Sequence, residues 1–450
     1  MAKKAKKKAA RKSASKKSAT KKASSALKAA ANTAKGVAKT KVSKTAKSTA
    51  DAFLGKYVIL KKSFAEAGDP FGGLESFPSV RASRIEDARP MEIAVAELRF
   101  QELADIRRDP RVLSIAPSMP MHLIEPVKVS AAATPTAAGA AWGIEAVGAN
   151  QSVSTGAGVV VAVLDTGIDA SHPAFTGVSL TQKNFTSEAA GDLHGHGTHC
   201  AGTIFGRDVG GFRIGVARGV SRAIIGKVLG AGGGSTESIA SAIMWAVEEG
   251  AHVISMSLGI DFGGFVKRLI DAGFPPELAT SRALEGYRTN VRLYDTLTAQ
   301  VRARGMLGNG TVLVAAAGNE SQRDVDPDFE VTVAPPATAD GIVSVAAIGK
   351  STSAANPFVL ADFSNTGANV AAPGVDISSA KRGGGLISMN GTSMATPHVA
   401  GVAALWAEQL MSITGGRLVG DQLIAKLVGT ARTLSGIDPM DVGAGLVKAP

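Results

Sequence analysis

The chain has 450 residues, 45% of them hydrophobic and 52 of them glycine, which is enough apolar material for one large core and a smaller domain. Its formal net charge of +11 is unevenly spread, because residues 1–50 hold 17 of the 49 Lys and Arg residues and no acid, and the remainder has 32 basic against 38 acidic residues. A single cysteine, Cys200, excludes an intrachain disulfide, and no apolar run reaches the roughly 20 residues of a membrane-spanning helix, so we expect no membrane partner.

Residues 1–52 consist almost wholly of Lys, Ala, Ser and Thr. Their charges are too dense and their apolar side chains too small to form a core, so we predict a disordered tail. No apolar stretch closely follows the lysines, so the sequence predicts no secretory signal and favours the cytoplasm. Three interpretations of the tail stay open: non-specific binding of nucleic acid, a solvated segment without a partner, and an organelle transit peptide.

A small domain is predicted over residues 55–125. Residues 57–60 are typical of a strand, residues 91–108 follow a helical pattern, and residues 112–116 are typical of a second strand. This stretch is too short and too poor in aromatic residues to be the main domain. A linker rich in Ala, Thr, Pro and Gly follows at residues 126–141, so we expect a small α+β module ahead of a larger domain.

The main domain, residues 142–450, is marked by short runs of Val, Ile and Ala that glycines bound and helical segments separate. These runs lie at residues 159–164, 223–228, 253–256, 312–316 and 342–345. Buried strands that alternate with helices form parallel sheets covered on both faces. We therefore predict an α/β fold with a mainly parallel sheet flanked by helices.

An extra segment interrupts this pattern at about residues 261–304, and an amphipathic, Arg-rich helix is predicted within it at about residues 278–304. Three roles for the segment are open: it caps a cleft, it supports a partner, or it decorates the surface. We favour surface decoration.

Asp165 stands at the carboxyl end of the first predicted strand of the main domain. Functional groups gather at such ends because the loops there converge on a crevice. A buried carboxylate at this place can accept a hydrogen bond from an imidazole and hold the ring in one tautomer. Taken alone, the residue is more typical of a turn or a helix cap.

Three histidines, His194, His196 and His199, crowd a glycine-rich turn that leads into a predicted helix. Glycines permit close backbone approach, and histidine is the natural general base near neutral pH. A rival interpretation is a zinc site formed by these histidines and Cys200. It is disfavoured, because no second cluster supplies further ligands and Gly-X-Gly turns make poor metal frames.

Ser393 lies at the expected start of a helix, in residues 390–401. Backbone N–H groups and the positive end of the helix dipole help an oxyanion to form there, although an ordinary capping serine has the same appearance. Pro397 fits the first turn, where its missing N–H has no partner inside the helix to lose. Asn319 follows another buried strand, and its amide can donate to a developing negative charge.

Together these four segments resemble the subtilase family of serine peptidases, in the family's chain order of Asp, His and Ser. The resemblance covers about residues 142–450 and implies a subtilisin-like fold and a serine endopeptidase that acts through an acyl-enzyme. The site residues that it implies are Asp165 as orienting acid, His196 as general base, Ser393 as nucleophile and Asn319 as oxyanion donor.

The resemblance also implies where a peptide substrate binds. Two groups of residues are implied: Leu229, Gly230, Ala231 and Gly232, which pair with the peptide as an added strand, and Ser257, Leu258 and Gly259, which line the first specificity pocket with Ala316, Ala317 and Gly318. Small residues in this pocket predict an open, apolar site that accepts large apolar residues before the cut.

Residues 57–125 resemble, less closely, the family's inhibitory propeptide, a small ferredoxin-like α+β domain. This implies a self-processed zymogen whose own propeptide is its partner and blocks the cleft until the linker is cut. Two departures concern calcium, because Ala174 stands where many members have a calcium-binding carboxylate and the loop 205–214 lacks the usual ligand pattern. Calcium dependence is therefore not supported, and we expect no cofactor.

Overall fold

A computed structural model describes residues 55–63, 91–99, 102–127, 139–306, 308, 310–353 and 356–450. The predicted disordered tail and most of the predicted linker lie outside these residues, so both stay predictions. Across the described ranges, none of the helices has the length and apolar character that crossing a membrane requires.

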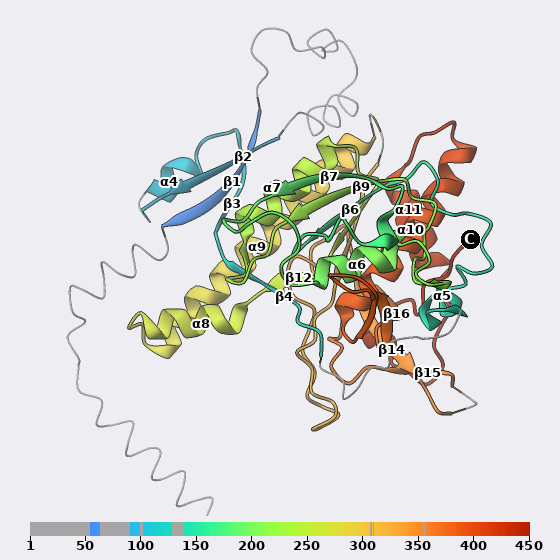
Figure 1. The fold of residues 1–450 in the computed structure, drawn as a ribbon. Helices are drawn as coiled ribbons and strands as arrows, with labels where there is room; N and C mark the ends of the chain where they lie inside the picture. Colours follow the sequence, from blue (N-terminus) through green and yellow to red (C-terminus); the bar gives the residue numbers. More distant parts are fainter. Residues whose placement is uncertain are drawn as a thin grey trace, which may run out of the picture. The chain divides into compact units, whose positions relative to one another are not determined.

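A central sheet of eight strands organises the main domain (Figure 1). Seven strands follow the order β15-β14-β13-β11-β6-β9-β7, and β16 pairs with β14. The strands are β6 (Val160–Asp165), β7 (Ser179–Asn184), β9 (Arg222–Lys227), β11 (Val253–Met256), β13 (Val312–Ala316), β14 (Ile342–Lys350), β15 (Phe358–Leu360) and β16 (Val370–Pro373). Every pairing is parallel except that of β14 with β15. The predicted mainly parallel sheet is confirmed.

Continuous burial explains why these segments form strands. Every residue of β6, β11 and β13 is buried, as expected for parallel strands covered on both faces, and β11 and β13 occupy the predicted residues. In this register Met256 lies beside Leu164 and also beside Ala315. The residues that follow these strands therefore meet at one edge of the sheet.

Helices flank the sheet. The two that begin at this edge, α6 (His196–Phe205) and α10 (Thr392–Ile413), pack against each other, and both contact β6. Further elements are α5 (Trp142–Ala146), α7 (Thr236–Glu248), α11 (Gly420–Gly429), α12 (Pro439–Val442), the 3-10 helix η1 (Pro173–Phe175), β5 (Gly139–Ala140), β8 (Phe212–Arg213) and the hairpin β17 (Ile377–Ala380) and β18 (Leu386–Met389).

A three-stranded antiparallel sheet, in the order β2-β1-β3, forms the N-terminal part of the described chain. Its elements are β1 (Lys56–Lys62), β2 (Met91–Glu97), α4 (Glu102–Ile106) and β3 (Val112–Pro117). The helix predicted over residues 91–108 is wrong for its first part. Pairing of β2 with β1, from Lys62 opposite Met91 to Lys56 opposite Glu97, overrides the helix propensity of Ala and Glu. The predicted ferredoxin-like arrangement also involves residues 64–90, which lie outside the described residues.

The next strand, β4 (Pro120–Leu123), leaves this sheet and joins the main domain. It lies between β10 (Gly234–Ser235) and β12 (Leu258–Ile260), antiparallel to both. One strand of a three-stranded sheet thus comes from the N-terminal region and two from the main domain.

The extra segment forms α8 (Phe262–Asp271) and α9 (Pro276–Gly305), so the predicted helix is confirmed. Helix α9 packs against β3 and α7. The buried Asn290 amide donates to the carbonyl oxygen of Pro117 over 3.0 Å and accepts from the Thr236 hydroxyl over 2.7 Å. The interpretation of this segment as surface decoration is wrong, because α9 supports the N-terminal region.

Candidate active site

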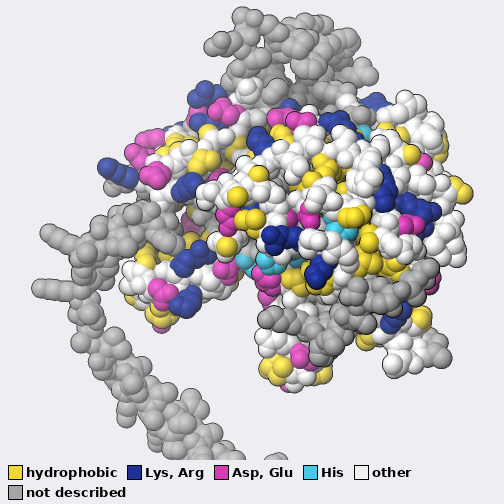
Figure 2. Space-filling view, in the orientation of Figure 1, with side chains coloured by type: hydrophobic (Ala, Val, Ile, Leu, Met, Phe, Trp, Pro, Cys, Tyr) yellow, Lys and Arg dark blue, Asp and Glu magenta, His cyan; other side chains and the backbone are white. Residues whose placement is uncertain are grey.

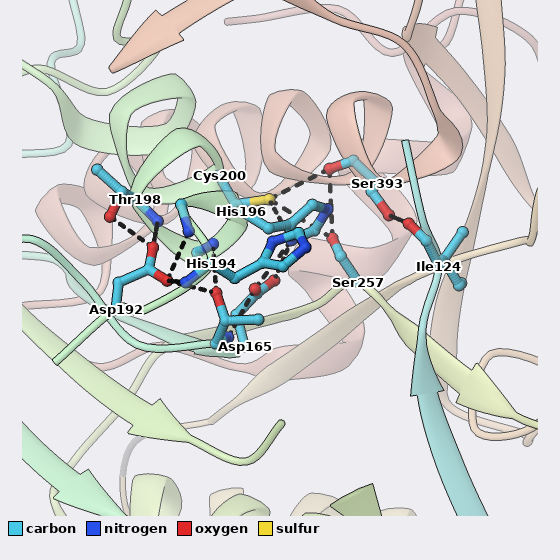
Figure 3. A network of polar contacts seen from close by, with 12 residues as sticks. Ile124, Asp165, Asp192, His194, His196, Thr198, Cys200, Ser257 and Ser393 are labelled. Atoms are coloured by element: carbon cyan, nitrogen blue, oxygen red, sulfur yellow. Dashed lines mark hydrogen bonds and ion pairs between the residues drawn. The ribbon is translucent and has the colours of Figure 1, made fainter. Parts of the chain in front are cut away.

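Asp165 and His196 come from adjoining element ends. Asp165 is the last residue of β6, and His196 is the first of α6. His196 Nδ1 lies 2.8 Å from Asp165 Oδ1 and 3.0 Å from Oδ2, and both side chains are almost completely buried (Figure 3). This carboxylate holds the ring with Nδ1 toward it and Nε2 away from it.

The environment of His196 sets its charge state. Burial by itself lowers the pKa of His196, but the Asp165 carboxylate raises it well above the ordinary imidazole value of about 6.5. His196 Nε2 is buried and has no hydrogen-bond partner among the described residues. The ring therefore has one nitrogen fixed by a carboxylate and the other available to accept a proton.

The neighbouring histidines differ from His196 in both contacts and exposure. Burial lowers the pKa of His199 to about 3, and its Nε2 lies 2.9 Å from the carbonyl oxygen of Ile377. His194 is exposed, and its Nε2 lies 3.8 Å from a carboxylate oxygen of Glu125. These side chains point to different partners, so the described residues do not form the zinc site weighed from the sequence.

A group that could hold a metal ion does occur in the described residues, namely Asp165, His196 and Cys200. The Cys200 sulfur lies 3.7 Å from His196 Nδ1 and 3.4 Å from the carbonyl oxygen of Ser393. Burial raises the pKa of the Cys200 thiol, which disfavours the thiolate that a metal needs. The thiol is buried against the site.

Ser393 is the second residue of α10 and is fully buried. Its hydroxyl donates to the carbonyl oxygen of Ile124 over 2.8 Å, the contact that Figure 3 shows beside the His196 ring. Helix α10 continues through Pro397, its sixth residue, so the prediction that Pro397 lies in the first turn is wrong. The missing N–H leaves the Ser393 carbonyl without its helical donor, and this carbonyl accepts instead from the Ser257 hydroxyl over 3.3 Å. The Ser393 hydroxyl is thus engaged by the N-terminal region rather than by His196.

Asn319 follows β13 and faces the start of α10. Its Oδ1 accepts from both the N–H and the hydroxyl of Thr392, each over 2.8 Å, and its Nδ2 donates to the carbonyl oxygen of Glu125 over 2.9 Å. Gly318 precedes it with φ +116°, and a Cβ there would lie 2.2 Å from Asn365 Nδ2. Thr392 therefore fixes the amide so that its N–H group points into the cleft, and only glycine fits the preceding position.

The residues predicted to line the first specificity pocket lie beside the N-terminal segment. In the pairing of β12 with β4, Leu258 is opposite Leu123 and Gly259 is opposite His122, and Ile124 N–H donates to the Ser257 carbonyl over 3.4 Å. Ile124 is only 3% exposed. The segment thus runs through the cleft as an extended peptide does when it adds a strand.

The N-terminal segment pairs just beyond the predicted substrate-pairing strand, which itself stays a prediction. The residues that pair with β4 are Gly234 and Ser235, beyond the predicted segment Leu229, Gly230, Ala231 and Gly232. Gly230 and Gly233 instead close a turn through reciprocal N–H to carbonyl bonds of 3.1 and 2.9 Å. Leu229, Gly230 and Ala231 line a cavity of about 230 Å³ together with Leu123 and Glu125.

A model of the Subtilase family (Peptidase_S8) matches residues 156–445, which is more than half of the chain and includes all four proposed catalytic positions. The chain belongs to the subtilase family. It is therefore a serine-type endopeptidase, a hydrolase that acts on peptide bonds of proteins or peptides.

Curated subtilases are similar over most of the chain. The chain is 31% identical to the "Thermostable alkaline protease" of Halalkalibacterium halodurans, over 81% of this chain and 84% of the relative. It is 31% identical to the "Subtilisin-like serine protease Pen ch 13" of Penicillium rubens (76% and 74%) and 33% identical to the "Subtilisin-like protease 6" of Trichophyton rubrum (58% and 57%). The first alignment covers more residues than the main domain contains, so it extends into the N-terminal region.

The sequence did not predict three groups in this subtilase site. The first is Thr392, which orients Asn319. The others are the carbonyl groups of Ile124 and Glu125 in the cleft, and Asp192 beside the His196 turn. Thr392 adjoins Ser393, and Asp192 precedes His196 by four residues, so a search for side chains that cap the two helix starts finds both. No sequence signal indicates which carbonyl of a distant segment enters the cleft.

Proposed function

We propose that Ser393 is the nucleophile, His196 the general base, Asp165 the acid that orients it, and Asn319 an oxyanion donor. Ser393 attacks a peptide carbonyl, its proton passes to His196 Nε2, and Asp165 stabilises the imidazolium that forms. The oxyanion accepts from Asn319 Nδ2 and from the Ser393 N–H, one of the first-turn amides without a partner inside the helix. Water then releases the acyl-enzyme. The Asp165–His196 contact and the position of Asn319 support these roles.

We also propose that the protein is a zymogen and that residues 55–127 include its propeptide. The observation that carries this is the hydrogen bond from the Ser393 hydroxyl to Ile124, which takes the proposed nucleophile away from His196. Strand β4 fills the space between β10 and β12, where a substrate strand would bind. Val127 N–H also donates to the Asn390 carbonyl over 2.9 Å, so the segment spans both sides of Ser393.

Ser393 and Asn319 must act on the same carbonyl group during catalysis, but here they contact the carbonyl groups of two neighbouring residues. Ser393 bonds the carbonyl of Ile124, whereas Asn319 bonds that of Glu125. Serine attack requires the oxyanion donors to face the oxygen of the attacked carbonyl. The covered site is therefore a resting state, and a shift of the segment is needed before it reacts.

In this proposal the first cut falls after Ile124. Its buried side chain lies beside Gly259, in the predicted first specificity pocket. The next bond is a weaker candidate, because it leads into Pro126, whose ring crowds the nitrogen that has to leave.

Incubation of the purified full-length chain, followed by intact mass measurement and N-terminal sequencing, tests this proposal. We expect a new N-terminus at Glu125, formed at a rate that is independent of protein concentration, and no cleavage in Ser393→Ala. A new N-terminus within residues 128–141 would overturn the bond assignment. Cleavage that persists in purified Ser393→Ala would overturn self-processing.

The proposed pocket predicts a preference for large apolar residues before the cut. Ile124 supports it, since an apolar side chain already lies beside Gly259 in the covered enzyme. A peptide library that differs only at this position should be cleaved faster after Leu or Phe than after Asp. Equal rates after Leu and Asp would contradict the pocket assignment.

We propose that the enzyme acts without a metal cofactor. Around the loop 205–214, a fixed cation already takes the carbonyl groups: the Arg207 guanidinium donates to Phe205 over 3.1 Å, to Val220 over 2.9 Å and to Arg218. Carbonyl oxygens of this kind are the ligands that calcium uses. Dialysis against a chelator should leave both activity and the unfolding midpoint unchanged, and a lowered midpoint that calcium restores would contradict this.

Non-specific binding of nucleic acid through residues 1–50 rests on the sequence alone. Figure 2 shows basic and acidic side chains interspersed over the face that it draws, so the described part of this face offers no continuous basic surface. A gel shift with and without residues 1–50 tests the tail. Equal binding by both forms would reject it.

A further inference from the structure

The buried side chain of Asp192 lies beside the proposed catalytic pair and takes no part in the steps above (Figure 3). Its Oδ1 accepts from His194 N–H over 2.9 Å, from Gly195 N–H over 2.8 Å and from the Thr166 hydroxyl over 2.9 Å. Its Oδ2 accepts from the N–H and the hydroxyl of Thr198 over 2.9 and 2.6 Å. One carboxylate thus receives five hydrogen bonds.

These donors lie on both sides of the proposed base. Gly195 precedes His196, Thr198 follows it within the first turn of α6, and Thr166 follows Asp165 at the end of β6. The Thr166 hydroxyl in turn accepts from Gly197 N–H over 3.0 Å. Asp192 and Thr166 therefore join the start of α6 to the end of β6.

The N-cap residue of α6 provides no side-chain cap of its own. Its N-cap residue is Gly195, with φ +103°, and the first turn contains no acidic residue. The first N–H groups of a helix need acceptors, and a negative charge there is favoured by the helix dipole. Asp192 supplies both from outside the helix.

The packing of glycines makes the junction sensitive to small displacements. A Cβ at Gly197 would lie 2.2 Å from the Gly167 carbonyl oxygen and 3.2 Å from Asp165 Oδ1. The backbones of the two elements therefore approach as closely as glycine allows, and the position of one determines that of the other.

We infer that Asp192 is a positioning residue for the proposed reaction: by fixing the first turn of α6 to the end of β6, it sets how the His196 ring meets Asp165 and Ser393. The inference rests on the proposed roles of these three residues. Burial raises the pKa of Asp192, but hydrogen bonds from Gly195 and Thr198 lower it further, so its pKa lies below the ordinary value. These hydrogen bonds therefore favour the ionised carboxylate.

Asparagine has the shape of aspartate but cannot replace it here. If its oxygen takes the place of Oδ1, its NH₂ group faces the N–H of Thr198, and two donors meet. Asp192→Asn should therefore shift the first turn of α6 without removing any group that touches the substrate. A displacement of about 1 Å in such a site costs on the order of 100-fold in rate.

The test compares Asp192→Asn with the wild type and with Asp169→Asn as matched control. Asp169 lies in the same region but accepts from Ser171 and Gly383 instead of the His196 turn. Self-cleavage of the full chain and hydrolysis of a short chromogenic peptide by the processed enzyme are measured. We expect kcat and the self-cleavage rate to fall about 100-fold with KM unchanged, and the low-field NMR signal of the His196 Nδ1 proton to shift or broaden. The control should keep kcat.

Wild-type kcat in a folded Asp192→Asn enzyme would overturn the inference, and so would a fall in kcat equalled by the control. Absence of activity and of serine labelling in the wild type would instead overturn the proposed function.

Should Asp192→Asn not fold, Thr198 provides the second test. Thr198→Val removes one donor to Asp192, and Thr198→Ser keeps it. Lowered kcat in the first and restored kcat in the second support the inference, and equal kcat in both overturns it.

Discussion

The two halves of the proposed site are in different states. The Asp165–His196 half is assembled within the main domain, with 2.8 Å between carboxylate and imidazole and several further hydrogen bonds around the turn. The Ser393–Asn319 half is engaged by the N-terminal region, through Ile124 and Glu125.

For the proposed zymogen, this difference assigns latency to the N-terminal region. The proposed general base, His196, needs no rearrangement before it acts, since its Nε2 has no partner among the described residues. The proposed nucleophile Ser393 and oxyanion donor Asn319 each contact a carbonyl oxygen, that of Ile124 and that of Glu125 respectively. In the proposed zymogen, activation therefore requires only that the N-terminal segment moves. Asp165→Asn and Asn319→Ala test the two halves, Gly286→Leu tests the contact of the N-terminal region with α9, and Arg207→Met tests the support of α6.

The largest effect is expected for Asp165→Asn, which breaks the assembled half. An amide presents a donor to His196 Nδ1 and favours the wrong tautomer, so kcat should fall about 10⁴-fold. The base must be neutral to act, so activity rises with pH through the His196 pKa, which lies above its ordinary value because of Asp165. Asp165→Asn loses the carboxylate charge that raises the pKa of His196 but keeps the burial that lowers it.

The acid limb of its profile of kcat/KM against pH should therefore move to lower pH than in the wild type. An unmoved limb would show that Asp165 does not set the pKa of His196.

Asn319→Ala tests the other half at its oxyanion donor. Removing such a donor from a member of this family costs about 100- to 1,000-fold in kcat, and we expect a loss of that size with KM little changed. The same variant also loses the contact to Glu125, so the covered form should bind its N-terminal segment less tightly. Steady-state kinetics of the processed enzyme measures the first effect, and a kcat within a factor of about two of the wild type would contradict the role.

Gly286→Leu should weaken the contact between the N-terminal region and α9 without changing a residue of either half of the proposed site. A Cβ at Gly286 would lie 3.0 Å from the Met119 sulfur, so a leucine has to displace the N-terminal region from α9. Overpacking of this kind costs about 1–3 kcal/mol, which predicts roughly tenfold faster labelling of the full chain by a fluorophosphonate. Gly263→Leu, at an open position of α8, is the matched control. Equal labelling rates in the two variants would show that α9 does not keep the N-terminal region in the cleft.

Arg207→Met has the smallest expected effect. It tests whether the contacts of Arg207, just after the C-terminal end of α6, stabilise the fold. Two of the three carbonyls that lose their donor belong to the buried residues Phe205 and Val220, so we expect about 1–3 kcal/mol of lost stability and an unfolding midpoint lower by a few degrees. Arg218→Met, which removes an exposed pair with Asp208, is the control and should change little. Thermal unfolding monitored by circular dichroism measures both. A midpoint equal to that of the control would remove the structural role of Arg207.

The sequence predicted the parts of the fold that depend on local pattern. Strands β11 and β13 lie at the predicted residues, because a continuous run of apolar β-branched and small residues is typical of a buried parallel strand. The residues proposed for the site follow such strands or begin helices, where the chain order of the motifs already indicated them.

The parts that failed depend on distant partners. Residues 91–97 have good helix formers but pair with β1. Nothing in the sequence of the extra segment, residues 261–304, indicated that Asn290 would contact Pro117. The five donors of Asp192 include the side chain of Thr166, 26 residues away in the chain, and long-range contacts of this kind leave no periodic pattern in a single sequence.

Labelling of the processed enzyme with a fluorophosphonate, followed by peptide mapping, tests the central claim most directly. The account predicts a single adduct on Ser393, formed faster after the N-terminal region has been cut than before, and none in Ser393→Ala. An adduct on another residue, or none on the processed wild type, would contradict the proposed active site.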